Sequence, residues 1–280
     1  MNLFTPAEIV SNYIGTGESK VNNKVSKMFV LAILSGLFIG FGAAASSTAA
    51  HNIANVGLAR LISGAVFPVG LIMVVLLGAE LFTGNMLISI SVCCRRIKLI
   101  RMIRCLAIVY VGNFVGSVVL ALIVAYSGQL NYSANGLAVY AMSIANTKCS
   151  LSFVSALLSG IACNILVCGA VLMCIASKDV VGKVFAAFFP IMAFITSGFE
   201  HSVANMYYIT LGLFAKTIPQ YADAAAAAGK DLSALTFGNM LLKNLLPVTI
   251  GNIIGGLIIA LLLWYGFSKK AEKAAANCKS

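Results

Sequence analysis

Two short polar segments interrupt an otherwise apolar sequence, and they share one pattern. GAELFTGNM at 78–86 and GFEHSVANM at 198–206 both read Gly-x-Glu-x-x-x-small-Asn-Met. Glutamate and asparagine are costly in lipid, so their recurrence at matched positions indicates a functional reason. His201 follows Glu200 in the second segment. A neutral imidazole donates one hydrogen bond and a protonated one holds an anion, so this pattern predicts a polar point suited to a small anion.

Two further polar side chains are candidates for the same point. Thr83 in the first segment is expected to donate a second hydrogen bond, and Asn164, inside a separate apolar run, is a third polar partner. Glu80 and Glu200 precede the inferred breaks, where freed backbone N–H groups need acceptors. We expect these carboxylates to hold the broken segments, with a proton relay as the alternative role.

Lys148 precedes an apolar run at the predicted outer face of the membrane. A single loop lysine is normally only solvated. Because this face carries few charges, the Lys148 ammonium is a candidate for drawing anions toward the mouth of a pore.

The elements that position these residues must cross a membrane. Apolar residues make up 60% of the 280 residues, charged residues make up 10%, and the mean hydropathy is +0.98. Soluble domains carry about 25% charged residues, so this composition excludes a soluble enzyme and a nucleic-acid-binding protein. The net charge of +11 is explained by basic cytoplasmic loops.

Six apolar runs are long enough to be membrane spans. The second and fifth are too long for one span and contain the two polar segments, which predicts broken helices. The runs are 28–50, 61–94, 103–126, 151–176, 184–214 and 238–267.

The spans form two halves of three, which we assign to repeat one (28–127) and repeat two (150–268). GNxxG at 112–116 in span three matches GNxxG at 251–255 in span six. Because three is odd, the halves must have opposite orientations in the membrane. Inverted repeats with paired broken helices are a transport architecture, with the substrate path between the breaks.

The two ends of the chain are predicted to be cytoplasmic. Fourteen of the nineteen Lys and Arg residues fall on the side that holds both ends, which the positive-inside rule assigns to the cytoplasm. TPAE at 5–8 is a capping box with Pro at the first helical position. It predicts an amphipathic helix within residues 1–27, while residues 269–280 form a basic tail.

No catalytic constellation is found in the sequence. It contains no serine-nucleophile motif and no phosphate-binding loop, and its cysteines are spaced around helices rather than as metal ligands. We therefore expect no enzyme activity, no cofactor and no metal. A neutral-solute pore for water or glycerol is the main alternative, although the paired Asn-Pro-Ala repeats of that class are absent. An intramembrane enzyme and a transceptor are weaker alternatives.

The segments at 78–85 and 198–206, with LPVTIGNIIGG at 246–256, resemble the formate/nitrite transporter family over essentially the whole chain. Among its branches the sequence looks most like the bacterial hydrosulfide channels. The resemblance implies an all-α membrane protein with an aquaporin-like fold and one pore in each protomer of a homopentamer. The sequence differs from many formate members of the family, which have Asp in place of Glu80 and Ser-Thr in place of Gly84-Asn85.

The resemblance also implies where the pore residues lie. Thr83 and His201 face each other at the pore centre, and Asn164 supports the histidine. The other implied positions are Leu71, Leu81 and Phe82 at the cytoplasmic slit, Phe67 and Phe194 at the external constriction, and Lys148 in the outer vestibule.

These features predict a multi-pass channel of the inner (plasma) membrane for small monovalent weak-acid anions. Hydrosulfide is the first expectation, with formate and nitrite also permeant. Basic vestibules attract the anion, and it passes the apolar constrictions near His201 as, or nearly as, the neutral acid. Formate or nitrite as the main substrate, with proton coupling, is the alternative. The expected partners are the anion, the lipid bilayer and further copies of the chain, with no nucleic acid.

Overall fold

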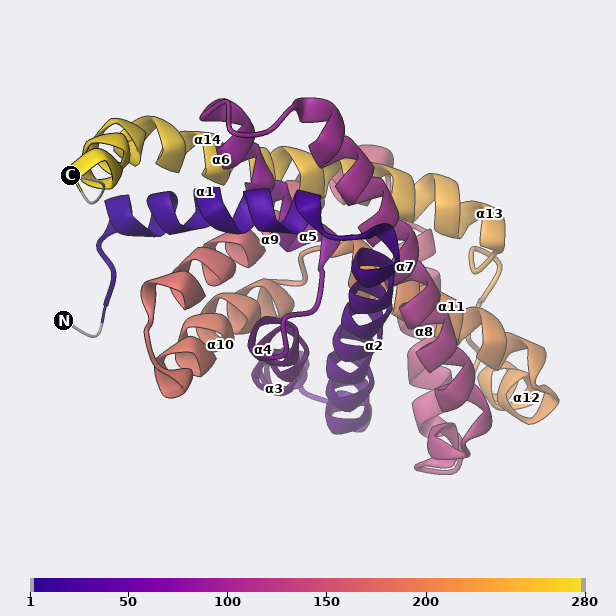
Figure 1. Cartoon of the computed structure of the whole chain (residues 1–280). Coiled ribbons are helices and arrows are strands. Elements are labelled where there is room, and N and C mark those ends of the chain that lie inside the picture. Colours follow the sequence, from indigo (N-terminus) through magenta and orange to yellow (C-terminus); the bar gives the residue numbers. More distant parts are fainter. Residues whose placement is uncertain (1–2, 278–280) are drawn as a thin grey trace.

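The computed structural model describes residues 3–277, with side chains described up to residue 268. The described chain is almost entirely helical, and six of its helical segments are apolar and long enough to cross a membrane (Figure 1). The predicted all-α class and the number of spans are therefore confirmed. The spans are α2 (Val25–Ala50), α3 with α4 (Val56–Val66 and Val69–Leu76), α7 (Leu99–Tyr126), α9 (Phe153–Ala176), α10 (Val180–Ser197), and α13 (Phe237–Asn239) with η3 (Met240–Leu245) and the start of α14 (Leu246–Asn277).

Both predicted breaks are present, and each begins at a glycine with positive φ. Gly78 (φ +70°) follows α4, and Gly198 (φ +75°) follows α10. A left-handed glycine ends a helix at little steric cost. After the first break the chain forms three short pieces, whereas after the second it forms one regular helix. The pieces are α5 (Phe82–Asn85), η1 (Met86–Ile88) and α6 (Ser89–Cys93), and the regular helix is α11 (Ser202–Thr217).

The two halves pack their first and third spans in the same way. α2 packs on α7, and α9 packs on α14. A Cβ atom added to Gly116 would lie 2.1 Å from a carbonyl oxygen of α2, and one added to Gly255 would lie 2.2 Å from a carbonyl oxygen of α9. Small residues let helix backbones approach this closely. The matched GNxxG motifs therefore mark equivalent helix contacts in the two repeats.

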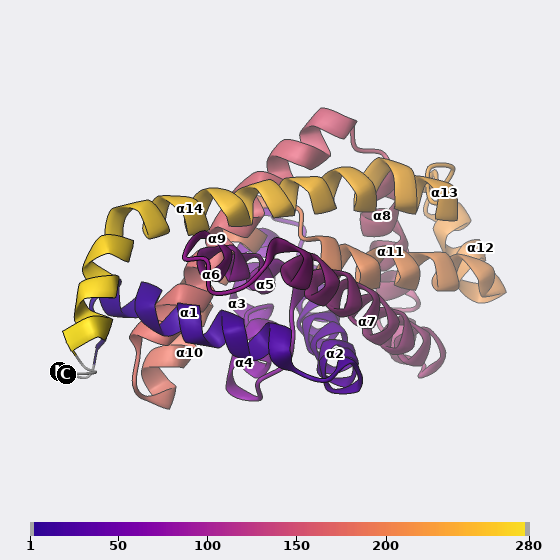
Figure 2. The same cartoon turned by 45° about the horizontal axis from the view of Figure 1, so that its top comes forward.

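A helix precedes each repeat, and only the first of these helices was predicted. α1 (Pro6–Asn22) begins at the predicted capping box, with Thr5 and Glu8 bonded reciprocally, and it packs along α14 and α6 (Figures 1 and 2). Hydrogen bonds from the backbone and side chain of Thr5 lower the pKa of Glu8. The sixth span ends at Ser268, near its predicted end, and its helix α14 continues to Asn277. The side chains of the basic tail lie outside the described residues.

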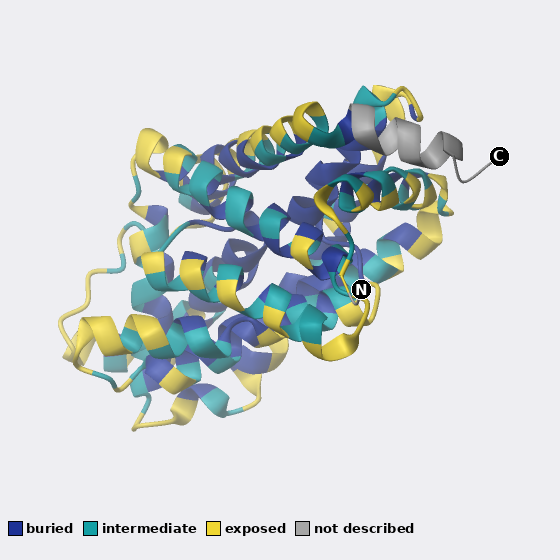
Figure 3. Ribbon diagram, turned by 90° about the vertical axis from the view of Figure 1, so that its left-hand side faces the viewer, coloured by how far each residue is buried: buried dark blue, intermediate teal, exposed yellow. Residues whose placement is uncertain are grey.

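The second of these helices, α8 (Gly136–Cys149), lies where the sequence analysis assigned only an external loop. Its inner face buries small and apolar side chains, and it packs on α11. Buried and exposed residues alternate along the helices at such contacts (Figure 3). The remaining described helices are η2 (Gln129–Asn131) and α12 (Pro219–Ala227), and the buried side chains of α8 are Leu137, Ala138, Ala141, Met142, Ala145 and Cys149.

Candidate functional site

Thr83 and His201 meet at the centre of the molecule and join the two breaks. The Oγ1 atom of Thr83 lies 2.8 Å from the Nε2 atom of His201, and both side chains are buried. The Nδ1 atom of His201 accepts a hydrogen bond of 3.0 Å from the backbone N–H of Ala204. Nδ1 is therefore unprotonated, so the neutral ring carries its proton on Nε2 and donates it to the Thr83 hydroxyl.

His201 thus has a second role that the sequence analysis missed. It is the N-cap residue of α11, because its ring nitrogen accepts from an amide in the first turn. A proton placed on Nδ1 would break this cap and would face the positive end of the helix dipole. The bond to Ala204 therefore favours the neutral ring that donates from Nε2.

Apolar side chains pack near this hydrogen bond. The ring of Phe194 lies 5.9 Å from the His201 ring, centroid to centroid, and packs edge-on against Phe67 at 5.7 Å. Leu71 and Leu81 are also buried. The hydrogen bond therefore lies in apolar surroundings.

Phe82, assigned to the same slit as Leu71 and Leu81, has a different neighbour. Its ring packs edge-on against Tyr110 of α7, 4.9 Å between centroids. Phe82 therefore anchors α5 to α7.

Asn164 reaches the pair through Thr83 rather than through the His201 side chain. Its Nδ2 donates to the backbone oxygens of Thr83 (3.2 Å) and Asn252 (2.6 Å). The thiol of Cys168, one helical turn further along α9, also donates to the Thr83 carbonyl at 3.3 Å. α9 therefore fixes the backbone at Thr83, the hydrogen-bond partner of His201.

The two glutamates have partners other than the expected backbone amides. Glu80 accepts hydrogen bonds from Lys20 and Asn85, both at 2.7 Å. Both carboxylates are buried, and each binds a lysine and the asparagine of the shared motif. Each glutamate therefore bonds a side chain of its own broken segment. In repeat two the partners of Glu200 are Lys148 (2.8 Å) and Asn205 (2.6 Å).

Lys148, the candidate for drawing anions, is paired with an acid. It sits in the last turn of α8, and its ammonium forms an ion pair with Glu200. Its charge is therefore largely compensated. Lys20 of α1 holds the matching place in repeat one, so each repeat includes the helix that precedes its first span.

Two asparagines, rather than the glutamates, bind the freed backbone of the breaks. Asn113 accepts from the N–H of Phe82 at 2.9 Å and donates to the Glu80 carbonyl. Asn252 accepts from the N–H of Ser202 at 2.9 Å and donates to the Glu200 carbonyl. These are the asparagines of the matched GNxxG motifs. That repetition was the available signal, but the sequence analysis took it only as evidence for a repeat.

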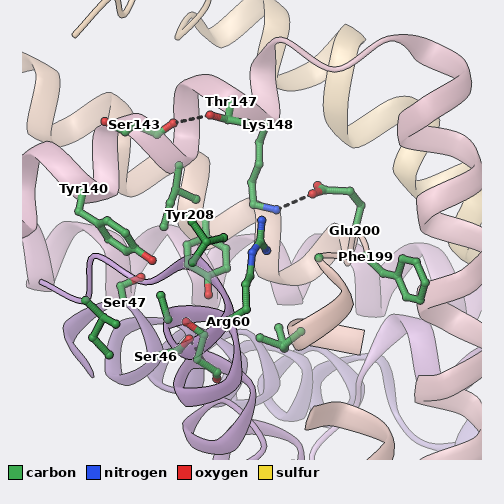
Figure 4. Close-up of a pocket in the computed structure, with 17 residues that line it drawn as sticks. Ser46, Ser47, Arg60, Tyr140, Ser143, Thr147, Lys148, Phe199, Glu200 and Tyr208 are labelled. Atoms are coloured by element: carbon green, nitrogen blue, oxygen red, sulfur yellow. Dashed lines mark hydrogen bonds and ion pairs between the residues drawn. The ribbon is translucent and has the colours of Figure 1, made fainter. Parts of the chain in front are cut away.

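Two cavities approach the closed centre. The first, which we call the α8 cavity, has a volume of about 400 Å³. The second, the α1 cavity, has a volume of about 320 Å³. The α8 cavity is shown in Figure 4 and is lined by Arg60, Tyr140, Lys148, Glu200 and Tyr208 among others; the α1 cavity is lined by Tyr13, Lys20, Leu71, Leu81 and Lys183 among others.

Within the described part of the chain, no group of three or more His, Cys, Asp or Glu side chains is placed to hold a metal ion. The polar groups of the centre are the Thr83 hydroxyl and the His201 imidazole, which are joined by one hydrogen bond. Chemically, the arrangement suits a small solute that needs brief hydrogen bonding between two apolar barriers.

Known proteins are similar to this chain in sequence and in fold. A family model described as formate/nitrite transporter matches residues 7–266. A probable formate transporter from Methanothermobacter thermautotrophicus is 35% identical over 95% of this chain and 98% of its own length. Two solved structures are also similar. One, a pentameric formate channel with formate bound, has a TM-score of 0.76 at 33% identity and covers 86% of this chain and 96% of its own. The other, an FNT family ion channel, has a TM-score of 0.81 at 28% identity and covers 92% of this chain and 98% of its own.

Proposed function

Because the chain belongs to the formate/nitrite transporter family, we propose that it conducts small monovalent weak-acid anions across the membrane. Its family and its solved neighbours are transporters and channels, so it is an integral membrane transport protein and not an enzyme. Hydrosulfide, formate and nitrite form the proposed substrate class.

The observation that carries this proposal is the Thr83–His201 hydrogen bond between apolar walls. Desolvating a small ion costs on the order of 20 kcal/mol in the idealised limit and several kcal/mol after relaxation. A bare anion is therefore held back by the Phe67–Phe194 and Leu71–Leu81 barriers. The neutral acid of the same anion avoids most of this cost.

The proposed path has three steps. The anion enters a cavity whose net charge is positive and loses water as it nears the barrier. Desolvation disfavours its charged form and raises its proton affinity, so it takes a proton from water in the cavity. It then crosses as the acid, with Nε2–H of His201 donating to it and the Thr83 hydroxyl as second partner. A multivalent anion would need several protons and is excluded.

Hydrosulfide is the first substrate of this proposal, because Glu80 and Gly84-Asn85 depart from the motif of many formate members. Formate is the second, since the relative from M. thermautotrophicus and one solved neighbour are named for formate. Formate or nitrite transport with proton coupling uses the same residues.

We further propose that the protein is a homopentamer in the plasma membrane with both termini in the cytoplasm. The solved neighbour titled as a pentameric channel supports the assembly. The distribution of Lys and Arg supports the orientation. In this proposed orientation the α1 cavity faces the cytoplasm and the α8 cavity faces the outside.

Stopped-flow uptake into proteoliposomes that hold the purified protein tests the proposal, with hydrosulfide, formate, nitrite and glycerol compared at several pH values. We expect fast flux of the three weak acids, rising as pH falls, and no glycerol flux. Their relative rates rank hydrosulfide against formate and nitrite.

The matched variants are His201→Phe and Thr83→Ser. His201→Phe should abolish most of the flux, because no imidazole donor remains at the centre, whereas Thr83→Ser keeps the hydroxyl and should transport. Normal flux in His201→Phe with unchanged pH dependence would defeat the mechanism. Glycerol flux without anion flux would assign the protein to the neutral-solute class instead.

A further inference from the structure

The α8 cavity contains one cation whose charge is not compensated. Three of its lining residues are charged, namely Arg60, Lys148 and Glu200. Lys148 and Glu200 form an ion pair at 2.8 Å. Arg60 has no hydrogen bond or ion pair with an acid among the described residues and is exposed to the cavity. The net positive charge of the cavity is therefore that of Arg60.

Arg60 is also aimed at the entrance to the closed centre. It lies in the second turn of α3, and its side chain points toward the Lys148–Glu200 pair from the opposite wall (Figure 4). A Cβ atom added to Gly198 would lie only 2.9 Å from Nη1 of Arg60. The guanidinium thus rests on the glycine that opens the break leading to His201, in the opposite repeat.

We propose that Arg60 is the residue that captures the anion in the α8 cavity before it reaches the constriction. This inference rests on the proposed function, and it replaces Lys148 by Arg60 as the main attracting charge. A guanidinium offers two parallel N–H donors, which match a carboxylate or another two-oxygen anion such as nitrite. Hydroxyl groups of Tyr140, Ser143 and Tyr208 line the same cavity and supply further donors.

The position of Lys148 strengthens this assignment. Arg60 and the Lys148 ammonium are both cationic and face one cavity, while the Glu200 carboxylate is already shared among Lys148, Asn205 and Asn244. An anion that enters between the two cations lowers their mutual repulsion. Arg60 can bind it without giving up an existing partner, whereas Lys148 would have to release Glu200.

The test measures anion uptake from the α8 side as a function of substrate concentration and salt. Arg60→Gln should raise the half-saturating concentration of formate and nitrite roughly five-fold at low ionic strength, the effect of one unit charge at contact distance in water. The difference from wild type should shrink as salt screens the charge. Arg60→Lys, which keeps the charge without the fork, should fall between the two.

The matched control is Lys230→Gln, which removes an exposed cation that does not line the cavity. It should leave uptake unchanged. An equal effect of Lys230→Gln would mean that general surface charge, and not Arg60, draws the anion.

A chemical rescue separates charge from folding. Arg60→Cys should show weakened uptake that a cationic methanethiosulfonate restores and an anionic one weakens further, with treated wild type as the reference. No response to either reagent, or wild-type saturation in Arg60→Gln, would overturn the inference while weak-acid flux persists. Absence of weak-acid flux in wild type would instead overturn the proposed function.

Discussion

The two breaks have the same supports and different chemistry. In each, a glycine with positive φ ends a helix, an asparagine of a GNxxG motif binds the freed amide, and a glutamate joins a lysine and an asparagine. At the position after the glutamate, however, repeat one has Leu81 and repeat two has His201. Two positions further along, repeat one has Thr83 and repeat two has Val203. The repeat thus preserves the framework, and the two residues that meet at the centre, Thr83 and His201, have no counterpart of the same type in the other repeat.

The difference between Leu81 and His201 also changes the local helix. His201 caps α11, which runs regularly for 16 residues. Leu81 offers no side-chain cap, and α5 lasts 4 residues before it turns into η1. Repeat two has one further polar contact, because Asn244 of the π-helix η3 bonds Asn205 and the backbone oxygen of Lys148. The histidine therefore stands on the more rigidly held side.

The largest expected effect comes from removing the glutamates. Glu200→Ala removes an acceptor that Lys148, Asn205 and Asn244 share, whereas Glu80→Ala removes one that only Lys20 and Asn85 share. Breaking a buried pair costs about 3–5 kcal/mol, so Glu200→Ala should destabilise most and Glu80→Ala less. Thermal unfolding in detergent, followed with a dye that reacts with the buried cysteines, measures both.

The control for this pair is Lys148→Met combined with Glu200→Gln. Removing both charges together should recover part of the stability lost in Glu200→Ala. Equal melting temperatures for Glu80→Ala and Glu200→Ala would show that Asn244 does not strengthen the second cluster.

Helix contacts offer a second comparison of the repeats. A Cβ atom at Gly36 would lie 2.2 Å from the Asn113 carbonyl oxygen, and one at Gly160 would lie 2.8 Å from the Val248 carbonyl oxygen. Overpacking costs about 1–3 kcal/mol, so Gly36→Ala should melt lower than Gly160→Ala. Gly15→Ala, with no atom within 4 Å of the added Cβ, should melt at or above wild type. The reverse order for Gly36 and Gly160 would mean that α2 and α7 can move apart more easily than α9 and α14.

The cap on α11 should have a smaller effect. His201→Leu copies the residue of repeat one and removes the acceptor for Ala204, which should cost about 0.5–2 kcal/mol. His201→Asn keeps a capping acceptor and should be closer to wild type in stability while still losing the Nε2 donor. Unfolding and flux measured on both variants separate the cap from the pore role. Identical melting of the two would assign His201 no capping energy.

The smallest effect concerns α1, whose capping box has no equivalent at the start of α8. The pKa of Glu8 is lowered below 4.5 by its bonds from Thr5. The contribution of Glu8 to the stability of the first turn of α1 is therefore fully present above about pH 4.5 and is lost as the pH falls through the lowered pKa. Hydrogen exchange in the first turn of α1 should speed up at such acidic pH beyond the intrinsic change. Glu8→Gln should lack this additional rise in exchange rate. A pH response identical to that of wild type would contradict the stabilising role of the Glu8 carboxylate.

The sequence allowed the spans, the breaks and the Thr83–His201 pair to be predicted, because apolar run length and a repeated polar motif are local signals. The resemblance to a known family supplied the further expectation that Thr83 and His201 face each other. Partners across long separations could not be predicted. Lys148 and Glu200 are 52 residues apart, and nothing local distinguishes a solvated loop lysine from a paired one.

Two other misses have the same origin. α8 was missed because its buried face consists mostly of small residues, which give little hydrophobic periodicity. The hydrogen-bond partners of Asn164 could not be predicted because a buried amide offers donors in several directions, and only the packed helices decide which carbonyls it reaches. Local pattern thus predicted the framework, while tertiary contacts decided the hydrogen-bond network.

The Thr83–His201 bond has a consequence for affinity. Thr83 is a tethered ligand of His201, present at the high effective concentration that a covalently linked partner enjoys. In the proposed path, every solute that reaches Nε2 must displace the Thr83 hydroxyl, and the Thr83–His201 bond re-forms when the solute leaves. If this path is correct, Thr83 acts as an internal competitor that keeps solute occupancy brief and binding weak, as rapid conduction requires.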